Sequence, residues 1–375
     1  AARDSRPEVT APSMVLPTTA HAAFHKAAHY FGVRPVMVDV DPVTFRADPS
    51  AMAAALDDTT VLVVASAPSY AHGVLDPVPE IAQLASARGI RCHVDACIGG
   101  WVLPLLGTPW PWTFAVPGVT SMSVDLHKYG YAPKGVSLLL HRTAALRRPQ
   151  LFASADWPGY TMLNAMMQST RSGGPLAAAW AVAHAIGDDG YAALAATART
   201  ATEAVAAGID DIPGVRVVAP PAATLVCLEV ADEGVDVFSI ADGMASRGWY
   251  VQPQLSYRDL PATVHLTISP AVAPAVPEFL NALSDTVENV RRAGPVRVAP
   301  ELAAMVSALD PTTLDEATFG ALLQFAGLAN ASGGFELPQA MAPVNALLNV
   351  ASPPVREALL LGVLDLLTRP ASLAP

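Results

Sequence analysis

The first 140 residues alternate short apolar runs with segments whose apolar positions recur at helical spacing. A run without polar residues, such as Val61–Ala65, predicts a buried strand. His21–Phe31 places apolar residues three or four positions apart, and Pro49–Leu56 is rich in alanine, with Asp48 as the predicted N-cap. Strands that alternate with helices favour an α/β fold, with a mostly parallel sheet and helices on both faces.

The strands of this region can be placed by their apolar runs. The predicted strands are Met14–Leu16, Pro35–Val40, Val61–Ala65, Arg91–Asp95 and Val136–Leu140, the last read as a core strand, and Val119-Thr120 predicts the end of another buried strand. A helix is predicted from Asp76 to about Arg88, where Gly89 ends it. Ligands of such sheets bind beyond the carboxyl ends of the strands, so polar residues there are candidates for a site.

The pattern changes after His141. Residues 141–171 are interpreted as a transition, because Pro149, Pro158 and Gly159 interrupt any regular period. Beyond it, helices are predicted over 176–186, 191–207, 237–247 and 276–291, and strands over 215–218, 224–230, 250–251 and 264–268. This mixture predicts a smaller α+β domain.

The last part of the chain is predicted to be a helical extension. A capping box at Thr313–Glu316 and the pair Pro353-Pro354 each precede an apolar helical pattern. Apolar stripes on these helices must pack against the main body or against another subunit. The predicted division is 1–150 for the remainder of a large domain, 151–296 for a linker and small domain, and 297–375 for the extension.

Composition narrows the class of protein. The 375 residues are 52% hydrophobic and 15% charged, which is typical of a large globular core. A net charge of -11 argues against a nucleic-acid surface. A membrane span is not predicted, because nowhere do 18 uncharged apolar residues follow one another. The first residues do not show the pattern of a signal peptide. The three cysteines, Cys92, Cys97 and Cys227, lack metal-ligand spacing and indicate a reduced, cytoplasmic protein.

An acid and a lysine stand near successive strand ends. Asp95 closes the predicted strand Arg91–Asp95, and Lys128 lies in the loop before Val136. Lysine is seldom buried without a reason, and one reason is a desolvated amine that forms a Schiff base. An Asp opposite such a lysine can keep a pyridine ring protonated. The pair is therefore the arrangement needed to hold both ends of pyridoxal 5'-phosphate, although Asp95 alone is equally well explained as a cap on the following turn.

The motif around this lysine extends the argument to a family. Ser123–Gly135 resembles the cofactor-lysine motif of the sphingosine-1-phosphate lyases, in the group II decarboxylase branch of fold-type I pyridoxal-phosphate enzymes. Further matching segments are Thr19–Ala28, His72–Glu80, His93–Cys97, Asp156-Trp157 and Ser169–Gly174, so that the resemblance covers about residues 8–292. It implies a fold-type I large domain followed by a smaller domain.

The resemblance also implies roles for residues that match the motifs. Lys128 would be the Schiff-base lysine and Asp95 the partner of the pyridine nitrogen, while His21 would stack on the ring. His127 and Ser123 would reach the cofactor phosphate, although a core strand hydroxyl explains Ser123 equally well.

Three further residues take roles on the substrate side. Lys134 would be a second active-site cation, against the alternative of a solvated loop lysine, and Tyr70 is a candidate to point into the site. Gly173, in the segment after Arg171, would lie near the cofactor of the partner subunit of a homodimer.

The implied reaction is a retro-aldol cleavage. A phosphorylated long-chain amino alcohol would be split into a long-chain aldehyde and phosphoethanolamine, and the base that removes the hydroxyl proton stays open among Lys134, Tyr70 and His21. Two alternatives remain: a decarboxylase of the same branch acting on an amino acid, and a non-catalytic relic that serves as a scaffold.

Parts of the family pattern are not found in these residues. The family's Gly-Gly-Thr-Glu-Ser-like phosphate loop has no match here, so we expect a separate or preceding segment to supply it, or else weak cofactor binding. Reading the codons upstream of Ala1 tests the first case. Trp157–Tyr160 departs from the family's glycine-rich version, and we identify no family counterpart for residues 297–375.

Overall fold

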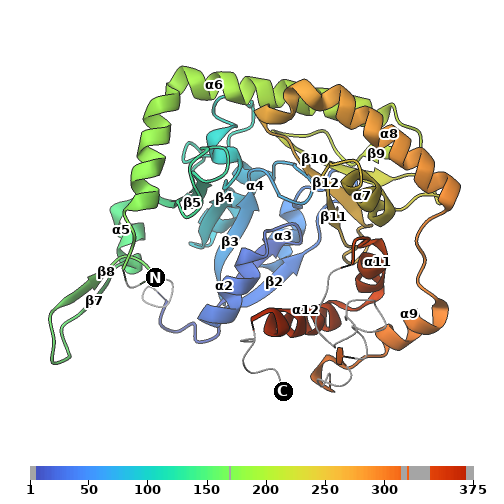
Figure 1. Ribbon diagram of the computed structural model, residues 1–375. Helices are drawn as coiled ribbons and strands as arrows, with labels where there is room; N and C mark the ends of the chain where they lie inside the picture. Colours follow the sequence, from blue (N-terminus) through green and yellow to red (C-terminus); the bar gives the residue numbers. More distant parts are fainter. Residues whose placement is uncertain (1–5, 169, 314–318, 321–337, 369–375) are drawn as a thin grey trace. The chain divides into compact units, whose positions relative to one another are not determined.

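The computed structural model describes residues 6–168, 170–313, 319–320 and 338–368 (Figure 1). It divides into two compact units. The first comprises Ala1–Ala206, Val218–Cys227 and Thr267–Pro274, and the second comprises Ala207–Val217, Leu228–Leu266 and Ala275–Pro375. The domain boundaries predicted above stay a prediction, and most of the predicted capping box lies outside the described residues.

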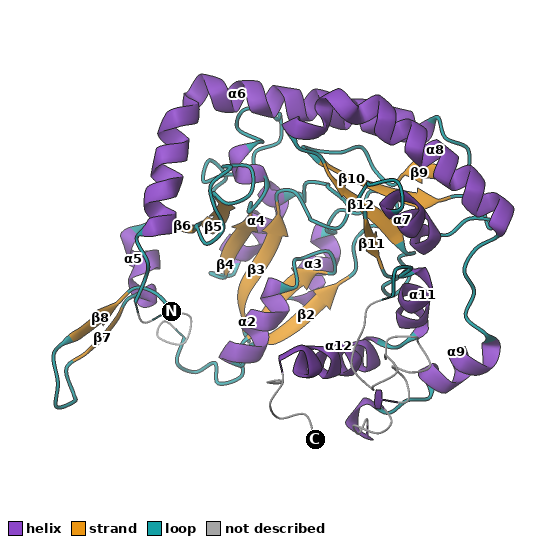
Figure 2. Cartoon of the chain, in the orientation of Figure 1, coloured by secondary structure: helices purple, strands orange, loops and turns teal. Residues whose placement is uncertain are grey.

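The first unit is built on a six-stranded sheet in the order β2-β1-β3-β4-β5-β6 (Figure 2). Its strands are β1 (Ser13–Pro17), β2 (Arg34–Val38), β3 (Thr60–Ser66), β4 (Arg91–Asp95), β5 (Val119–Asp125) and β6 (Ser137–His141). The first five strands are parallel, and β6 runs antiparallel to β5. The predicted α/β fold with a mostly parallel sheet is confirmed.

Helices cover both faces of this sheet because alternate strand residues point to opposite sides. On one face, Val15 and Val63 pack in a core with residues of α3 (Pro49–Ala55) and α4 (Val78–Ala87). On the other face, Leu16 and Val64 pack with α2 (Ala23–Phe31). The predicted cap of α3 is confirmed, since the Asp48 carboxylate accepts hydrogen bonds from the backbone of Ser50 and Ala51.

Two predictions about β5 and β6 were wrong. Val119-Thr120 begins β5 rather than ending a strand, because five more residues continue the ladder as far as Asp125. Val136–Leu140 was predicted to be a core strand, but β6 forms the edge of the sheet, and Leu138, Leu139 and Leu140 are exposed. An apolar run does not by itself distinguish a central strand from an edge strand that lacks a partner.

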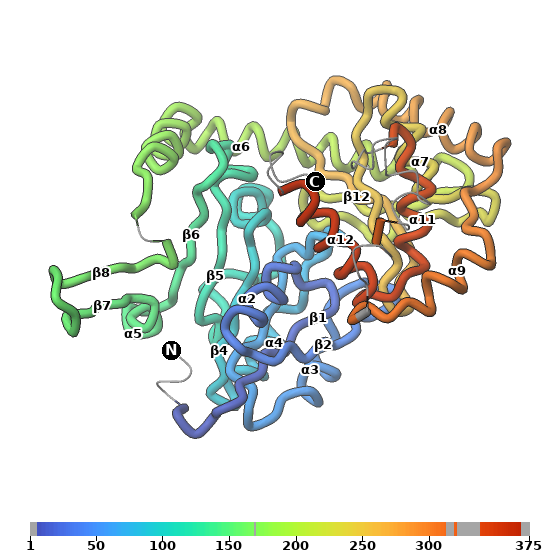
Figure 3. Tube along the Cα trace, turned by 60° about the horizontal axis from the view of Figure 1, so that its bottom comes forward, coloured from blue at the N-terminus to red at the C-terminus, as the bar shows by residue number. Residues whose placement is uncertain are grey.

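The segment after β6 contains a hairpin that the sequence did not predict. A short helix, α5 (Ala144–Arg147), is followed by the antiparallel pair β7 (Phe152–Ser154) and β8 (Met162–Asn164). Figures 1 and 3 both show this hairpin projecting away from the six-stranded sheet. Pro158 and Gly159 lie in the long loop between its strands, so they mark the turn of a hairpin and not an irregular region.

A long helical span follows. α6 (Gly174–Asp210) contains a break at Gly187, whose φ of 64° and ψ of 174° are not helical. Two helices, over 176–186 and 191–207, were predicted on either side of this point. Glycine adopts such a backbone conformation without the steric cost that a side chain brings.

The second unit contains a smaller α+β arrangement. Its sheet has the order β11-β12-β10-β9, formed by β9 (Val215–Val217), β10 (Leu225–Val230), β11 (Gln252–Gln254) and β12 (Thr263–Thr267). The strand predicted at 250–251 is displaced to β11. Helices α7 (Val237–Ala245) and α8 (Val276–Ala293) pack together, with Gly243 against Thr286.

The C-terminal helices are α9 (Pro300–Ser307), α11 (Ala342–Val350) and α12 (Pro353–Thr368). They belong to the second unit, and polar contacts join α11 and α12 to the rest of it. Asp242 of α7 accepts hydrogen bonds from the backbone of Met341 and Ala342, and Arg356 of α12 donates to the carbonyl of Ser256. Among the described residues, no helix is both long and apolar enough to span a membrane.

Candidate active site

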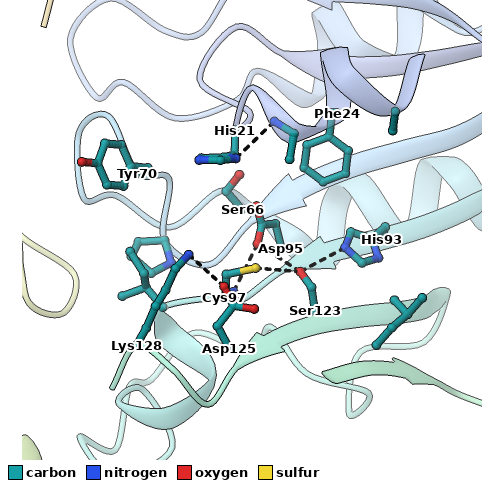
Figure 4. A pocket seen from close by; sticks show the side chains of 15 residues that line it. His21, Phe24, Ser66, Tyr70, His93, Asp95, Cys97, Ser123, Asp125 and Lys128 are labelled. Carbon is teal, nitrogen blue, oxygen red and sulfur yellow. Dashed lines mark hydrogen bonds and ion pairs between the residues drawn. The ribbon is translucent and has the colours of Figure 1, made fainter. Parts of the chain in front are cut away.

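A pocket of about 340 Å³ lies at the carboxyl ends of β3, β4 and β5 in the first unit (Figure 4). Its lining side chains come from the sheet, from α2 and from the loops between them: His21, Ala23, Phe24, Ala27, Ser66, Pro68, Tyr70, His93, Asp95, Cys97, Ile98, Ser123, Asp125, Lys128 and Leu139. Aliphatic and phenyl side chains are interspersed with polar groups that converge on the pocket, which is typical of small-molecule and cofactor sites.

Asp95 is fixed at one wall of this pocket. It ends β4, and the ladder register sets it opposite Ser123 of β5. Its Oδ1 accepts hydrogen bonds from the Ser123 hydroxyl at 3.0 Å and from the Cys97 backbone N–H at 3.1 Å. These bonds hold the carboxylate in one orientation, and within the described part of the chain Oδ2 makes no hydrogen bond and is left for a ligand.

A buried histidine continues this network beneath the pocket. His93 Nδ1 lies 2.9 Å from the Ser121 hydroxyl, and Nε2 lies 3.3 Å from the Ser123 hydroxyl. Ser123 directs its one hydrogen to Asp95, so His93 must donate through Nε2 and accept at Nδ1. Burial lowers the pKa of His93 to about 4, so the ring is neutral at physiological pH and supports this pattern.

Cys97 also meets this network. Its Sγ donates to the Ser123 oxygen at 3.3 Å. Burial, and then the charge of Asp95, raise the pKa of the Cys97 thiol well above its usual range. The thiol is therefore protonated and acts as a weak hydrogen-bond donor rather than as a nucleophile.

Lys128 enters the pocket from the loop that follows β5. Its Nζ lies 3.0 Å from Asp125 Oδ2, and Figure 4 shows the side chain reaching toward that carboxylate. The side chain of Lys128 is 30% exposed and that of Asp125 only 10%. Lys128 is thus partly exposed and forms an ion pair, which corrects the expectation that it is a desolvated lysine.

The backbone around Lys128 is held by close packing. A side chain at Gly130 would place its Cβ 2.6 Å from the Leu126 carbonyl oxygen, so only glycine fits there. The Tyr191 hydroxyl donates to the Gly130 carbonyl at 2.8 Å, and the buried Tyr129 hydroxyl donates to the Ile268 carbonyl at 2.7 Å. These bonds fix the turn that carries Lys128.

His21 and Tyr70 form the opposite rim of the pocket, with their rings edge to face and 6.2 Å apart (Figure 4). His21 Nδ1 accepts a hydrogen bond from the Ala23 backbone N–H at 3.2 Å. In the neutral ring the hydrogen is then on Nε2, so His21 can donate a hydrogen bond there to an oxygen of a ligand.

The structure brings together five of the residues predicted from the sequence. Lys128, Asp95, Ser123, His21 and Tyr70 all line the pocket. Their individual roles stay predictions.

The other three predicted residues lie outside that lining. His127 is half-buried, with Nε2 3.6 Å from Asp125 Oδ2, and its Nδ1 is buried without a hydrogen-bond partner among the described residues. Lys134 and Gly173 are exposed and do not line the pocket.

Sequence reasoning missed Asp125, His93 and Cys97 as parts of the site. All three lie within the segments that resemble the family, and Asp125 precedes Lys128 by three residues. An acid at that spacing from a lysine, directly after a strand, is a signal for an ion pair.

The pocket fits pyridoxal phosphate in its central parts. An amine at Lys128, a carboxylate with an unused oxygen at Asp95, and the apolar side chains of Phe24, Ile98 and Leu139 are the groups that a charged aromatic ring with an aldehyde requires. The buried, unpartnered Nδ1 of His127 is a further polar atom beside the site.

Fold and pocket together define an α/β protein with a cofactor-type site at the carboxyl ends of a parallel sheet. The family model described as "Pyridoxal-dependent decarboxylase conserved domain" matches residues 5–231. The chain belongs to the pyridoxal-dependent decarboxylase family, which confirms the predicted family and fold.

Individual relatives agree with this assignment. The sphingosine-1-phosphate lyases of Dictyostelium discoideum and Arabidopsis thaliana are each 37% identical over 293 residues, which is 77% of this chain and 53% of theirs. The structure of the Burkholderia pseudomallei sphingosine-1-phosphate lyase is 35% identical with a TM-score of 0.73, covering 78% of this chain and 66% of that one. The chain spans about half the length of the curated relatives it matches.

More distant matches concern the fold and the C-terminal segment. Glutamate decarboxylase of Lactobacillus brevis has a TM-score of 0.70 at 17% identity, covering 79% of this chain and 70% of that one, and shows a shared fold alone. A model described as "Pyridoxal-dependent enzyme, C-terminal putative HTH domain" matches residues 300–366. The expectation that residues 297–375 have no family counterpart was therefore wrong.

Proposed function

We propose that this chain forms the lysine-bearing part of a pyridoxal-phosphate-dependent carbon–carbon lyase. Its substrate would be a phosphorylated long-chain amino alcohol, the class to which the sphingosine-1-phosphate in its relatives' names belongs. The products would be a long-chain aldehyde and phosphoethanolamine. The observation that carries the proposal is the meeting of Lys128 and Asp95 in one pocket. The similarity to sphingosine-1-phosphate lyases supports this substrate class over other members of the family.

Each residue of the pocket would contribute in a distinct way. Pyridoxal phosphate, when bound, supplies the electron sink for bond cleavage. Lys128 would hold it covalently, and Asp95, already oriented by Ser123 and Cys97, would keep a proton on the ring nitrogen through Oδ2. His21 would lie against the ring and donate from Nε2.

The base that takes the substrate's hydroxyl proton is proposed to be Tyr70. His21 Nδ1 is already occupied by the Ala23 backbone, and Lys134 does not line the pocket. Tyr70 does line it, on the rim opposite Lys128. This choice narrows the three candidates left by the sequence to one.

A homodimer is part of the proposal. The segment from β6 to the start of α6 exposes a series of large apolar side chains, which a second copy of the chain would cover: Leu138, Leu139, Leu140, Leu151, Phe152, Trp157, Tyr160, Leu163, Met166, Met167, Leu176 and Trp180. Gly173 lies within this segment, in keeping with its predicted role at the partner's site. The three free cysteines support a cytoplasmic location.

The test uses the full chain and its variants. The chain is mixed with pyridoxal phosphate, reduced with borohydride, and digested for mass spectrometry. We expect the cofactor's mass on Lys128 and none on Lys26 or Lys134, and we expect the visible absorbance of the lysine-bound cofactor to vanish in Lys128→Ala but not in Lys134→Ala. Equal labelling of all three lysines contradicts the proposed site.

Product analysis then decides the reaction. With sphingosine-1-phosphate as the probe, release of a long-chain aldehyde and phosphoethanolamine supports the lyase. Carbon dioxide released from an amino acid selects the decarboxylase instead. Absence of any cofactor on Lys128 at millimolar concentration favours the non-catalytic scaffold.

A further inference from the structure

Asp125 is a buried acid that the proposed chemistry leaves without a role. It ends β5, and its side chain is 10% exposed. Oδ1 accepts a hydrogen bond from the Ser137 hydroxyl of β6, while Oδ2 lies 3.0 Å from Lys128 Nζ and 3.6 Å from His127 Nε2. Among the described residues, every polar contact of this carboxylate is thus with a donor or a cation.

The surroundings of Asp125 favour its charged form. Burial alone would raise its pKa, but the hydrogen bond from Ser137 and the neighbouring Lys128 and His127 outweigh burial and lower the pKa below its usual value. Because the ladder pairs Asp125 with Ser137, the carboxylate cannot easily turn away from Lys128. The acid is therefore a fixed anion beside the amine.

We propose that Asp125 is a positioning residue that holds the Lys128 amine in an ion pair and so limits its reaction with carbonyl compounds. An ammonium nitrogen has no free electron pair and cannot attack a carbonyl carbon. The inference rests on the proposed function in one respect, namely that Lys128 is the amine that bonds to the cofactor.

Bond formation at Lys128 would break this ion pair. One proton would leave Nζ for solvent water, because Asp125 stays charged, and this would free the electron pair for the new C–N bond. The two hydrogens left on nitrogen would depart with the carbonyl oxygen as water, leaving a C=N bond. No oxidant, reductant or further reactant is needed.

The chain permits a sharp test because it has only three lysines, Lys26, Lys128 and Lys134. Formaldehyde with cyanoborohydride performs the same carbonyl addition on any free amine and fixes it as a methyl group, without the cofactor. Peptide mass spectrometry after brief treatment, repeated between pH 6 and 9, gives the relative rate at each lysine. Lys26 and Lys134 are exposed and act as internal references.

We expect Lys128 to be methylated about tenfold more slowly than Lys134 at pH 7, since its amine is held 3.0 Å from a buried carboxylate of opposite charge. Asp125→Asn should raise the Lys128 rate about tenfold, while Asp125→Glu restores the slow rate. Asp95→Asn is the matched control, because it removes a carboxylate of the same pocket that forms no ion pair with Lys128 in the described part of the chain.

Three results would overturn the inference: a wild-type Lys128 that reacts as fast as Lys134, no change of rate in Asp125→Asn, or the same change in Asp95→Asn. Should Asp125→Asn fail to fold, Asp125→Ser gives the neutral variant, and the wild-type pH profile alone still decides the first case. The cofactor measurements on Lys128 are separate, so either proposal can fail while the other stands.

Discussion

Two regions of the first unit differ in how their side chains find partners. One is the carboxyl ends of β4 and β5, and the other is the segment that follows β6. At the strand ends, Asp95, Ser123 and His93 bond to one another, and Lys128 is paired with Asp125. After β6, leucines, aromatic residues and methionines are exposed in succession. The difference teaches that the polar groups at the strand ends find partners within this chain, whereas the following segment exposes the apolar side chains that we propose a second copy covers.

The largest predicted effect concerns the exposed segment. Phe152 is 56% exposed and Leu163 81% exposed on the β7–β8 hairpin. If a second copy covers both, Phe152→Ser with Leu163→Ser should weaken self-association about a thousandfold, at about 1 kcal/mol for each of the four partly exposed side chains that the dimer would lose. Sedimentation equilibrium measures this, with Val43→Ser as a control at a distant exposed site. Equal dissociation constants for the double variant and the wild type would argue against the proposal that a second copy covers this hairpin.

The first unit should lose folding stability in acid. His72 stacks on Phe45 at 4.5 Å, and burial lowers the pKa of His72 from 6.5 to about 4. Its neutral form therefore stabilises the fold above pH 6.5, and this contribution of about 3 kcal/mol is lost as the pH falls from 6.5 to 4. Between pH 6.5 and 4, the free energy of unfolding of His72→Phe should therefore fall by about 3 kcal/mol less than that of the wild type.

Urea titrations at several pH values give that difference directly. Asp76, whose pKa burial raises to about 6, contributes equally to both proteins and cancels in the comparison. Parallel pH profiles for wild type and His72→Phe would show that His72 is not the group responsible.

A smaller effect is expected for the ligand-facing acid. Asp95→Asn should weaken the binding of pyridoxal phosphate about thirtyfold, because a hydrogen bond to a charged group contributes about 2 kcal/mol. Titration in the Lys128→Ala background isolates this non-covalent binding, and Cys97→Ala serves as the control at a neighbouring position. Unchanged affinity in Asp95→Asn would remove Asp95 from the cofactor site.

The smallest effect tests the turn that carries Lys128. Tyr129→Phe leaves the Ile268 carbonyl without its hydrogen bond of 2.7 Å, and it should lower the free energy of unfolding by about 1 kcal/mol. Chemical denaturation measures the change. A loss close to zero would mean that packing alone holds the turn.

Part of the parallel sheet could be predicted because β1 and β3 contain apolar runs between turn residues. Asp95 could be placed at a strand end because the strand Arg91–Asp95 follows the glycine that ends the preceding helix. The hairpin β7–β8 could not be predicted, because its strands have only three residues each and its loop contains Pro158 and Gly159. The ion pair of Lys128 was missed because contacts across a turn depend on where a strand ends, and β5 ends three residues before Lys128.

The exposed edge of β6 bears on how the protein should be handled in the laboratory. Its outer side has no neighbouring strand among the described residues, and three consecutive leucines are exposed along it. Such an edge is a template for pairing with a strand of any other chain. We therefore expect concentrated samples to lose material to strand-paired aggregates unless this edge is covered. A Leu140→Lys variant, which leaves the pocket lining unchanged, offers a practical route to a well-behaved preparation.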